Sequence, residues 1–234
     1  MRVLILRPRE LLAKTIEVLR EEGFEAYGCP FIELEYLDFE VPEHDFVIVT
    51  SQNIARVLVK KSVELKKIIA IGKKTAEILK TAGYDVLVPT KFDSENLYKE
   101  FSDILRGKKV VAVRSDKGSK ILYKISEISD FREIIAYRIK PLRGKEQIRE
   151  IEKIASYFYD SVVYSSSMIA RNFLELCREH DCLENLERVY NIAIGPPTAN
   201  VLRSYGINPF MPDEYTFDGV IKLLKNLKDV SFRC

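Results

Sequence analysis

The chain has 234 residues, 47% of them hydrophobic, which is enough to bury the cores of one large or two small domains. Its 37 Lys and Arg residues nearly balance 35 Asp and Glu residues, and this argues against a nucleic-acid-binding protein, which usually carries a strong positive field. No apolar run approaches the roughly 20 residues that a membrane-spanning helix needs, and no signal-like segment follows Met1. We therefore expect a soluble, cytoplasmic protein that binds neither nucleic acid nor membrane.

Taken in chain order, short apolar runs alternate with segments of helical periodicity. The apolar runs, which predict strands, are residues 3–6, 25–31, 45–50, 67–71, 86–88, 110–114, 134–139, 161–164, 191–194 and 209–211. Amphipathic segments such as 11–22, 94–105 and 147–157 predict helices between them. Strands that alternate with helices are typical of an α/β protein with parallel sheets covered on both faces.

Two segments predict connections between domains. Residues 33–40 alternate acidic and apolar side chains, which fits either a solvated linker or an edge strand. Pro141 would stop the strand predicted at 134–139. Connectors at about 33–40 and 136–142 predict a discontinuous first α/β domain, 1–33 plus 142–234, and an inserted second α/β domain, 38–137. Five predicted strands fall in each domain, which favours two flavodoxin-like sheets.

One motif occurs twice. The sequence IAIGKKTAEIL at residues 69–79 returns as IAIGPPTANVL at residues 192–202. In each copy an apolar run ends at Gly, and Thr-Ala then opens a segment of helical periodicity, so each copy predicts a strand, a tight loop and a helix. The repetition indicates that the two halves of the chain are related.

The carboxyl ends of the predicted parallel strands gather residues that could bind an anion, because these ends meet at one edge of a sheet. The candidate binding residues are Arg7, Thr50, Ser51, Gly72, Thr75, Arg114, Ser115, Ser165, Ser166, Ser167, Gly195 and Thr198. Most of them precede a helix, whose free N–H groups and positive dipole end favour carboxylates or phosphates.

A structural interpretation of these residues stays open. Ser51, Thr75 and Ser166 are ordinary N-cap residues that any α/β protein could carry. Pro196 and Pro197 have no N–H group, so the second copy of the repeated motif offers fewer backbone donors than the first.

The sequence contains no signature of nucleotide binding, of a serine nucleophile or of a zinc protease. The soft-metal ligands are few and scattered: Cys29, Cys177, Cys182, Cys234, His44 and His180. Both histidines lie between acidic residues, which is typical of solvated surface, and no C-x-x-C pair is present. We therefore expect reduced thiols and no metal site.

A series of loose motifs spans nearly the whole chain in a fixed order. They are Thr50-Ser51 with Ala55, Ile71-Gly72-x-x-Thr75-Ala76-x-x-Leu79, Val113-Arg114, Ala136-Tyr137-Arg138, Ser165-Ser166-Ser167, and Ala193-Ile194-Gly195-Pro196-x-Thr198-Ala199-x-x-Leu202 ahead of Gly206. Together they resemble the uroporphyrinogen III synthase family.

The resemblance implies two flavodoxin-like domains with a two-stranded connector and an active site in the cleft between them. It implies a hydro-lyase that converts hydroxymethylbilane into uroporphyrinogen III, with loss of water and inversion of ring D, using no cofactor or metal. The substrate carries eight carboxylates, which suits loops rich in hydroxyls and helix N-termini. A monomer is expected, with room for a transient contact with the preceding enzyme of the pathway. The sequence does not specify whether haem, sirohaem or cobalamin is the end product.

Residue roles also follow from the resemblance. Tyr137 matches the family's tyrosine at the connector, where a phenol could protonate the leaving hydroxyl, and a core or hinge role is an open alternative. Thr75 and Thr198 match threonines that face the cleft, and Ser51 and Ser166 match the hydroxyls opposite. The competing function is a two-lobed cytoplasmic protein that binds a small anionic molecule without catalysis.

Overall fold

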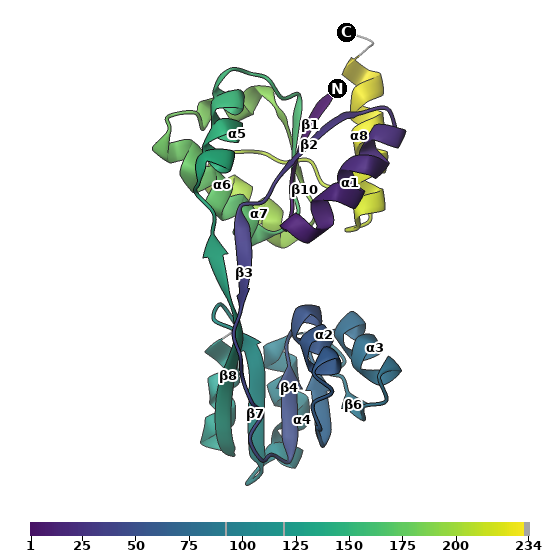
Figure 1. Ribbon diagram of the computed structural model, residues 1–234, viewed down its shortest axis with the longest axis vertical. Coiled ribbons are helices and arrows are strands. Elements are labelled where there is room, and N and C mark those ends of the chain that lie inside the picture. Colours follow the sequence, from purple (N-terminus) through teal and green to yellow (C-terminus); the bar gives the residue numbers. More distant parts are fainter. Residues whose placement is uncertain (92, 119, 232–234) are drawn as a thin grey trace. The chain divides into compact units, whose positions relative to one another are not determined.

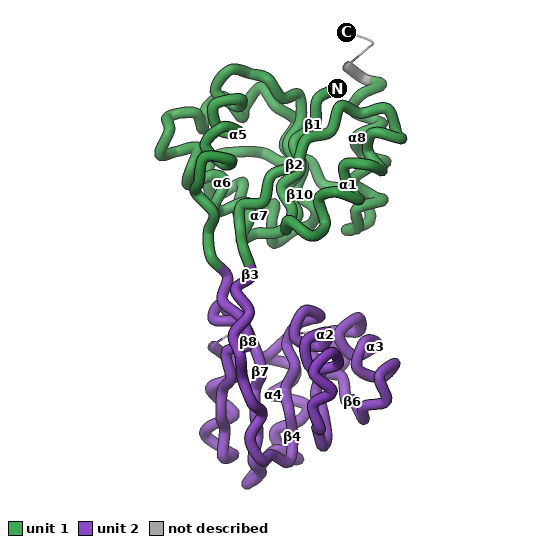
Figure 2. Tube along the Cα trace, in the orientation of Figure 1, with its two compact units in different colours: residues 1–33, 140–234 green, residues 34–139 purple. Residues whose placement is uncertain are grey.

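The computed structural model describes residues 1–91, 93–118 and 120–231 of the chain. Cys234 lies outside these residues. The chain divides into two compact units (Figure 2), which we call unit 1 (Met1–Glu33 and Lys140–Cys234) and unit 2 (Leu34–Ile139). None of the helices described is long and apolar enough to cross a membrane.

Unit 1 is a parallel sheet between two layers of helices (Figure 1). Its strands lie in the order β10 (Tyr190–Ala193), β9 (Ser161–Tyr164), β1 (Arg2–Leu6) and β2 (Glu25–Cys29). Successive residues of β1 and β9 are buried, as expected for strands covered on both faces. Helices α1 (Arg9–Glu21) and α8 (Phe217–Ser231) pack on one face, against Val3 and Ile5. The remaining helices of unit 1 are α5 (Lys145–Ala155), α6 (Ser167–Glu179), α7 (Pro196–Ser204) and the short 3-10 helix η2 (Glu184–Arg188).

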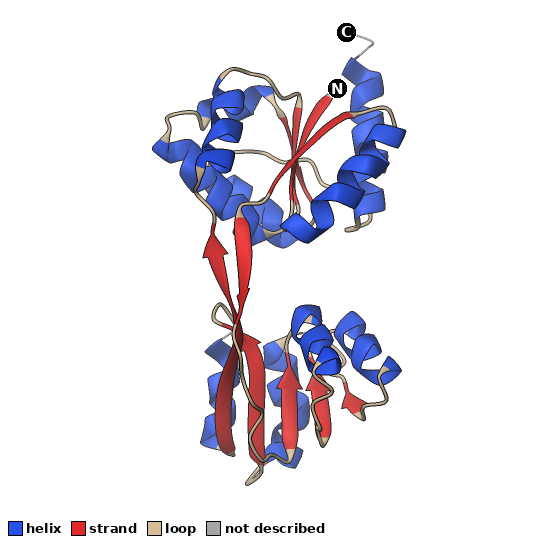
Figure 3. Cartoon of the chain, in the orientation of Figure 1, coloured by secondary structure: helices blue, strands red, loops and turns tan. Residues whose placement is uncertain are grey.

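Unit 2 has the strand order β3 (Ile32–Tyr36), β8 (Asp130–Pro141), β7 (Lys109–Ser115), β4 (Phe46–Val49), β5 (Lys67–Ala70) and β6 (Val86–Leu87). Its strands β4 to β8 likewise form a parallel sheet between two layers of helices, and β3 lies beside β8 at its edge (Figure 3). Helices α2 (Gln52–Lys60) and α3 (Lys73–Thr81) cover one face, where Val47 and Val49 are buried. Helix α4 (Ser94–Leu105) and the 3-10 helix η1 (Lys120–Glu127) cover the other, where Phe46 and Ile48 are buried.

The strand counts differ from the expectation of five strands in each sheet, because the sheets have four and six strands. In unit 1 the predicted strand at 209–211 is reduced to one bridge, Ile192 to Phe210. Phe210 makes both of its backbone hydrogen bonds there, but Pro209 and Pro212 lack the N–H groups that would lengthen the ladder. In unit 2 the sixth strand is β3, so part of the segment left open as a linker or edge strand is an edge strand.

Candidate active site

Strands of unit 1 end in register, so the loops after them share one edge of the sheet. Leu6, Tyr164 and Ala193 lie side by side at the ends of β1, β9 and β10. We call the residues that follow, 7–9, 165–167 and 194–198, the carboxyl edge of unit 1. The corresponding carboxyl edge of unit 2 comprises residues 50–51, 71–75 and 114–116, after β4 and β5 and at the end of β7.

Arg7 is held in place at the carboxyl edge of unit 1. Its Nη1 donates to Thr15 Oγ1 at 2.8 Å, and its guanidinium carbon lies 4.6 Å from the centre of the Phe217 ring. Its Nε is buried and has no hydrogen-bond partner among the described residues. Burial lowers the pKa of Arg7 from its usual value, which is high enough that the side chain remains a cation at neutral pH. The edge therefore carries a preorganised positive charge.

The three serines after β9 have separate hydrogen-bonding roles. Ser165 Oγ donates to the Leu6 carbonyl at 2.7 Å, which ties β9 to β1. Ser166 is the N-cap of α6, and its hydroxyl accepts from Ile169 N at 3.3 Å, as the N-cap interpretation predicts. Ser167 is the first residue of the helix and is partly exposed.

The second copy of the repeated motif offers no backbone donor in the first turn of α7. Gly195 is the N-cap, and Pro196 and Pro197 occupy the first two helical positions without N–H groups. Thr198 N and Ala199 N both donate to the Gly195 carbonyl, at 3.1 and 3.0 Å. The Thr198 side chain is buried. Beside Gly195 lies the exposed ring of Tyr215, which the sequence analysis did not single out.

In unit 2, the hydroxyls of Ser51 and Tyr137 lie close together near the end of β4. Ser51 is the N-cap of α2, and its Oγ accepts from Ile54 N at 3.4 Å. The same Oγ lies 3.4 Å from the hydroxyl of Tyr137 on β8. The Tyr137 ring is 6% exposed and packs in the core of unit 2, 5.8 Å from the ring of Tyr36. Thr50, which precedes Ser51, is partly exposed.

The first copy of the repeated motif, unlike the second, offers backbone donors in the first turn of its helix. Gly72 is the N-cap of α3 and has a φ of 105°, a left-handed conformation that favours glycine. Thr75 is the third residue of the helix and is buried, so its interpretation as an N-cap was wrong: the glycine fills that place. The N–H groups of Lys73, Lys74 and Thr75 have no acceptor among the described residues. This turn can therefore receive an anion.

Arg114 is buried rather than open to solvent. Its Nε lies 2.6 Å from Glu133 Oε1, and its guanidinium lies 5.5 Å from the Tyr123 ring centre. Tyr123 in turn donates to Glu133 Oε2 at 2.7 Å. The side chain of Arg114 is 3% exposed and that of Glu133 is 20% exposed. Ser115 is also buried. Arg114 therefore already has a carboxylate partner within unit 2.

His44 corrects the expectation that both histidines lie on solvated surface. His180 is exposed, but His44 is buried. Its Nε2 accepts from Lys66 N at 3.1 Å, which leaves Nδ1 to donate to the Pro42 carbonyl at 2.7 Å. The ring joins two loops by hydrogen bonds, and this long-range role is invisible in the Glu-His-Asp sequence. The described residues contain no group of three metal-ligating side chains.

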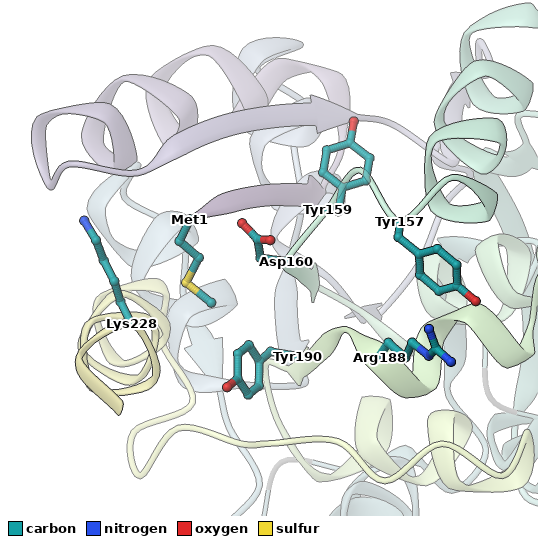
Figure 4. A pocket seen from close by; sticks show the side chains of 7 residues that line it. All are labelled: Met1, Tyr157, Tyr159, Asp160, Arg188, Tyr190 and Lys228. Atoms are coloured by element: carbon teal, nitrogen blue, oxygen red, sulfur yellow. The ribbon is translucent and has the colours of Figure 1, made fainter. Parts of the chain in front are cut away.

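A cavity of about 590 Å³ lies at the opposite, amino edge of the unit 1 sheet (Figure 4). It is lined by Met1, Tyr157, Tyr159, Asp160, Arg188, Tyr190 and Lys228. In Figure 4 Lys228 and Arg188 lie on opposite sides of the cavity, and the hydroxyl of Tyr159 donates to Glu150. Lys228 donates to the Gly23 carbonyl at 2.8 Å, and Asp160 accepts from Arg2 N at 2.6 Å. Without convergent polar groups this cavity is a weak candidate for a binding site.

Comparisons with known proteins agree along the chain. The family profile described as Uroporphyrinogen-III synthase HemD matches residues 13–222. A protein of Archaeoglobus fulgidus, named provisionally as a uroporphyrinogen-III synthase, is 62% identical over 228 residues, which are 97% of this chain and 100% of that protein. A Methanocaldococcus jannaschii protein with the same provisional name is 27% identical over 242 residues, covering 98% of this chain and 100% of that protein.

The fold is similar to that of solved structures. A mutant uroporphyrinogen III synthase from Thermus thermophilus has a TM-score of 0.71 and 21% identity, with 100% of both chains covered. The Helicobacter pylori uroporphyrinogen-III synthetase has a TM-score of 0.64 and 19% identity, covering 97% of this chain and 100% of that one. The profile match and the 62% identity extend over both units, and therefore the chain belongs to the uroporphyrinogen-III synthase family.

Proposed function

We propose that this protein is a lyase that cyclises hydroxymethylbilane to uroporphyrinogen III, with loss of water and inversion of ring D. The observation that carries the proposal is the family match over residues 13–222, which includes the carboxyl edge of unit 2 and, apart from residues 7–9, that of unit 1. The chemistry of these edges is consistent with the substrate. Arg7, the hydroxyl-capped helix α2 and the open first turn of α3 all favour the carboxylates that the tetrapyrrole carries.

We further propose that each unit acts as one domain of a monomer. Each has its own sheet and its own buried clusters, and β3 and β8 are the strands in which the chain passes from one unit to the other. Both carboxyl edges bind substrate. Because the leaving hydroxyl departs from a pyrrole that itself supplies electrons, much of the enzyme's task is to hold the linear chain in the orientation that leads to inversion.

Tyr137 is the candidate proton donor in this proposal. Its hydroxyl lies near Ser51 Oγ, so a serine at the N-cap of α2 can orient the phenol. Transfer of the phenolic proton to the substrate hydroxyl breaks the carbon–oxygen bond and releases water. A proton lost from carbon when the ring closes restores the phenol, so no proton is consumed overall. The buried ring is consistent with a residue held in one orientation.

The decisive experiment supplies the purified protein with hydroxymethylbilane generated enzymatically in the same vessel. The uncatalysed reaction closes slowly to the non-inverted isomer, so rate and isomer ratio are read together after oxidation and separation of the products. We expect the III isomer in excess. Formation of only the non-inverted isomer at the uncatalysed rate would refute the proposed activity and leave binding without catalysis.

The role of Tyr137 is tested by Tyr137→Phe, which keeps the ring but removes the proton. Because general acid assistance is typically worth about 10²-fold to 10⁴-fold, kcat should fall by that order while the residual product remains the III isomer. Tyr98→Phe is the matched control, since Tyr98 packs on the other face of the same sheet. A near-normal rate for Tyr137→Phe would remove this residue from the chemistry and leave it a core role.

A further inference from the structure

Three consecutive residues, Tyr215, Thr216 and Phe217, lie against the carboxyl edge of unit 1. A Cβ placed on Gly195 would lie 3.4 Å from Tyr215 Cγ, so the tyrosine packs beside the loop after β10. Phe217 packs under the guanidinium of Arg7, which follows β1. Between them, Thr216 caps helix α8: its Oγ1 accepts from Gly219 N at 3.1 Å and its carbonyl accepts from Val220 N at 3.1 Å. The segment thus connects two loops of the edge and is fixed by a helix cap.

Tyr215 presents a ring where the edge lacks hydrogen-bond donors. The residue is 59% exposed although it leans on Gly195. The neighbouring Pro196 and Pro197 are exposed and have no N–H groups, and the N–H of Thr198 is already bonded. A single exposed tyrosine is common on protein surfaces and by itself indicates nothing. Here, however, it lies at the edge where parallel sheets bind ligands, and its surroundings favour contact through flat apolar faces.

Arg7 provides the second observation. It is a cation without an acidic partner among the described residues, although part of its side chain is buried. A partly desolvated charge of this kind is stabilised by an anion that approaches its remaining N–H groups. Tyr215 lies against Gly195 after β10, and Arg7 follows β1. Only β9 separates these two strands in the sheet, so their ends lie about 10 Å apart, a span that one pyrrole ring with its acid side chain can bridge.

We propose that Tyr215 and Arg7 form a subsite for a single pyrrole ring of the tetrapyrrole, with the ring on Tyr215 and a carboxylate of that ring on Arg7. The inference rests on the proposed function for the identity of the ligand. A pyrrole is flat and electron-rich, so it packs against a tyrosine in an offset or edge-to-face arrangement, and the guanidinium binds a carboxylate through two parallel hydrogen bonds. Thr15 and Phe217 are positioning residues, because they hold Arg7 without reaching the ligand themselves.

The experiment compares Tyr215→Ala, Tyr215→Phe and Arg7→Gln by steady-state kinetics with hydroxymethylbilane. Tyr215→Ala should raise KM about threefold to tenfold with kcat little changed, because the lost contact serves binding. Tyr215→Phe keeps the ring face and should stay within about twofold of the wild type. Arg7→Gln should raise KM about tenfold or more. If both side chains hold the same pyrrole, the double variant should lose less than the product of the two single effects.

Tyr157→Asn is the matched control, since it removes an exposed ring from the amino edge of the same unit. Asn also tolerates the left-handed backbone of that position, where φ is 55°. Thermal unfolding of every variant separates misfolding from weakened binding. The control should retain wild-type KM, and a KM rise in Tyr157→Asn equal to that in Tyr215→Ala would overturn the specific role of Tyr215.

A direct titration with uroporphyrin III, the oxidised form of the expected product, tests the subsite without turnover. Binding is followed by porphyrin absorbance, and Tyr215→Ala and Arg7→Gln should each weaken it severalfold. If the wild type makes the III isomer but Tyr215→Ala has unchanged KM and porphyrin affinity, the subsite is wrong and the proposed function stands. If the wild type makes no III isomer, the proposed function fails. Porphyrin binding that is weaker in Tyr215→Ala than in the wild type would then still support the subsite. Equal binding by the two proteins, or no binding by either, would overturn it.

Discussion

The two copies of the repeated motif fold alike but differ in the backbone N–H groups that they offer to a ligand. Both place a glycine at the N-cap and a buried threonine at the third position of a helix. In α3 the first turn has two exposed lysines and three N–H groups for which the described part of the chain supplies no acceptor. In α7 two prolines remove the first two donors, and the third is bonded to Gly195. The two copies therefore share a fold, while the two residues between Gly and Thr, lysines in one copy and prolines in the other, determine which hydrogen-bond donors and charges a ligand meets.

The matching arginines of the two units differ in the same way. Arg7 follows β1 and Arg114 lies near the end of β7, the strand that resembles β1 in sequence. Arg114 is paired with Glu133, whereas Arg7 rests on Phe217 and Thr15. Of the two matching arginines, the one available to a ligand therefore belongs to unit 1, whereas the open backbone donors of the repeated motif belong to its copy in unit 2.

The largest expected difference concerns stability. Arg114→Ala would leave the mostly buried Glu133 without its cation, and breaking such a pair costs about 2–4 kcal/mol, at the lower side of values for fully buried pairs. Arg7→Ala removes a hydrogen bond and a ring contact and should cost about 1 kcal/mol. Denaturant unfolding of both variants measures the difference.

The double variant Arg114→Met with Glu133→Leu is the control for this comparison, because it removes both charges and should recover most of the lost stability. Equal destabilisation by Arg114→Ala and Arg7→Ala would mean that the two arginines have the same structural role, contrary to the contacts described.

A smaller difference is expected between the two N-cap glycines. Gly72 has a φ of 105°, so Gly72→Ala should cost about 1–3 kcal/mol of backbone strain. Gly195 has an extended backbone with a φ of −176°, and an added Cβ would meet Tyr215 at an ordinary contact distance of 3.4 Å. Gly195→Ala should therefore change thermal stability little. A Gly195→Ala variant as unstable as Gly72→Ala would show that the loop after β10 is as constrained as the loop after β5.

Much of the fold is local in origin and could be predicted from the sequence. Strand β9, helix α4 and the N-caps Ser51 and Ser166 follow from apolar periodicity and from hydroxyl residues placed ahead of helices. The two glycine loops were predicted because their sequence repeats. The choice of Gly72 as the cap in place of Thr75 depends on backbone conformation, and a residue pattern does not report that.

The residues that escaped prediction have distant partners. Glu133 meets Arg114 only because β8 pairs with β7 in a particular register. His44 is buried and forms hydrogen bonds with the backbone of Lys66 and Pro42, and the sequence around His44 does not show the contact with Lys66. Tyr215 packs against Gly195, which follows β10 and lies 20 residues earlier in the chain. The assignments of Tyr137 and of the binding residues remain predictions.

The smallest expected effect gives the sharpest test of the comparison, because it exchanges the feature that distinguishes the two copies. Pro197→Ala restores an N–H group to the first turn of α7, and Lys74→Pro removes one from the first turn of α3, where the other copy shows that proline fits the helix. Pro197→Ala should cost about 0.4–1 kcal/mol of stability, because alanine gives the unfolded chain more freedom. It should change KM for hydroxymethylbilane by less than about twofold if this part of unit 1 binds through flat faces rather than backbone donors.

Lys74→Pro should raise KM severalfold more than Lys74→Ala, which removes the same charge but keeps the N–H group. A marked tightening of substrate by Pro197→Ala, or identical KM values for Lys74→Pro and Lys74→Ala, would contradict the division of binding between ring faces in unit 1 and backbone donors in unit 2.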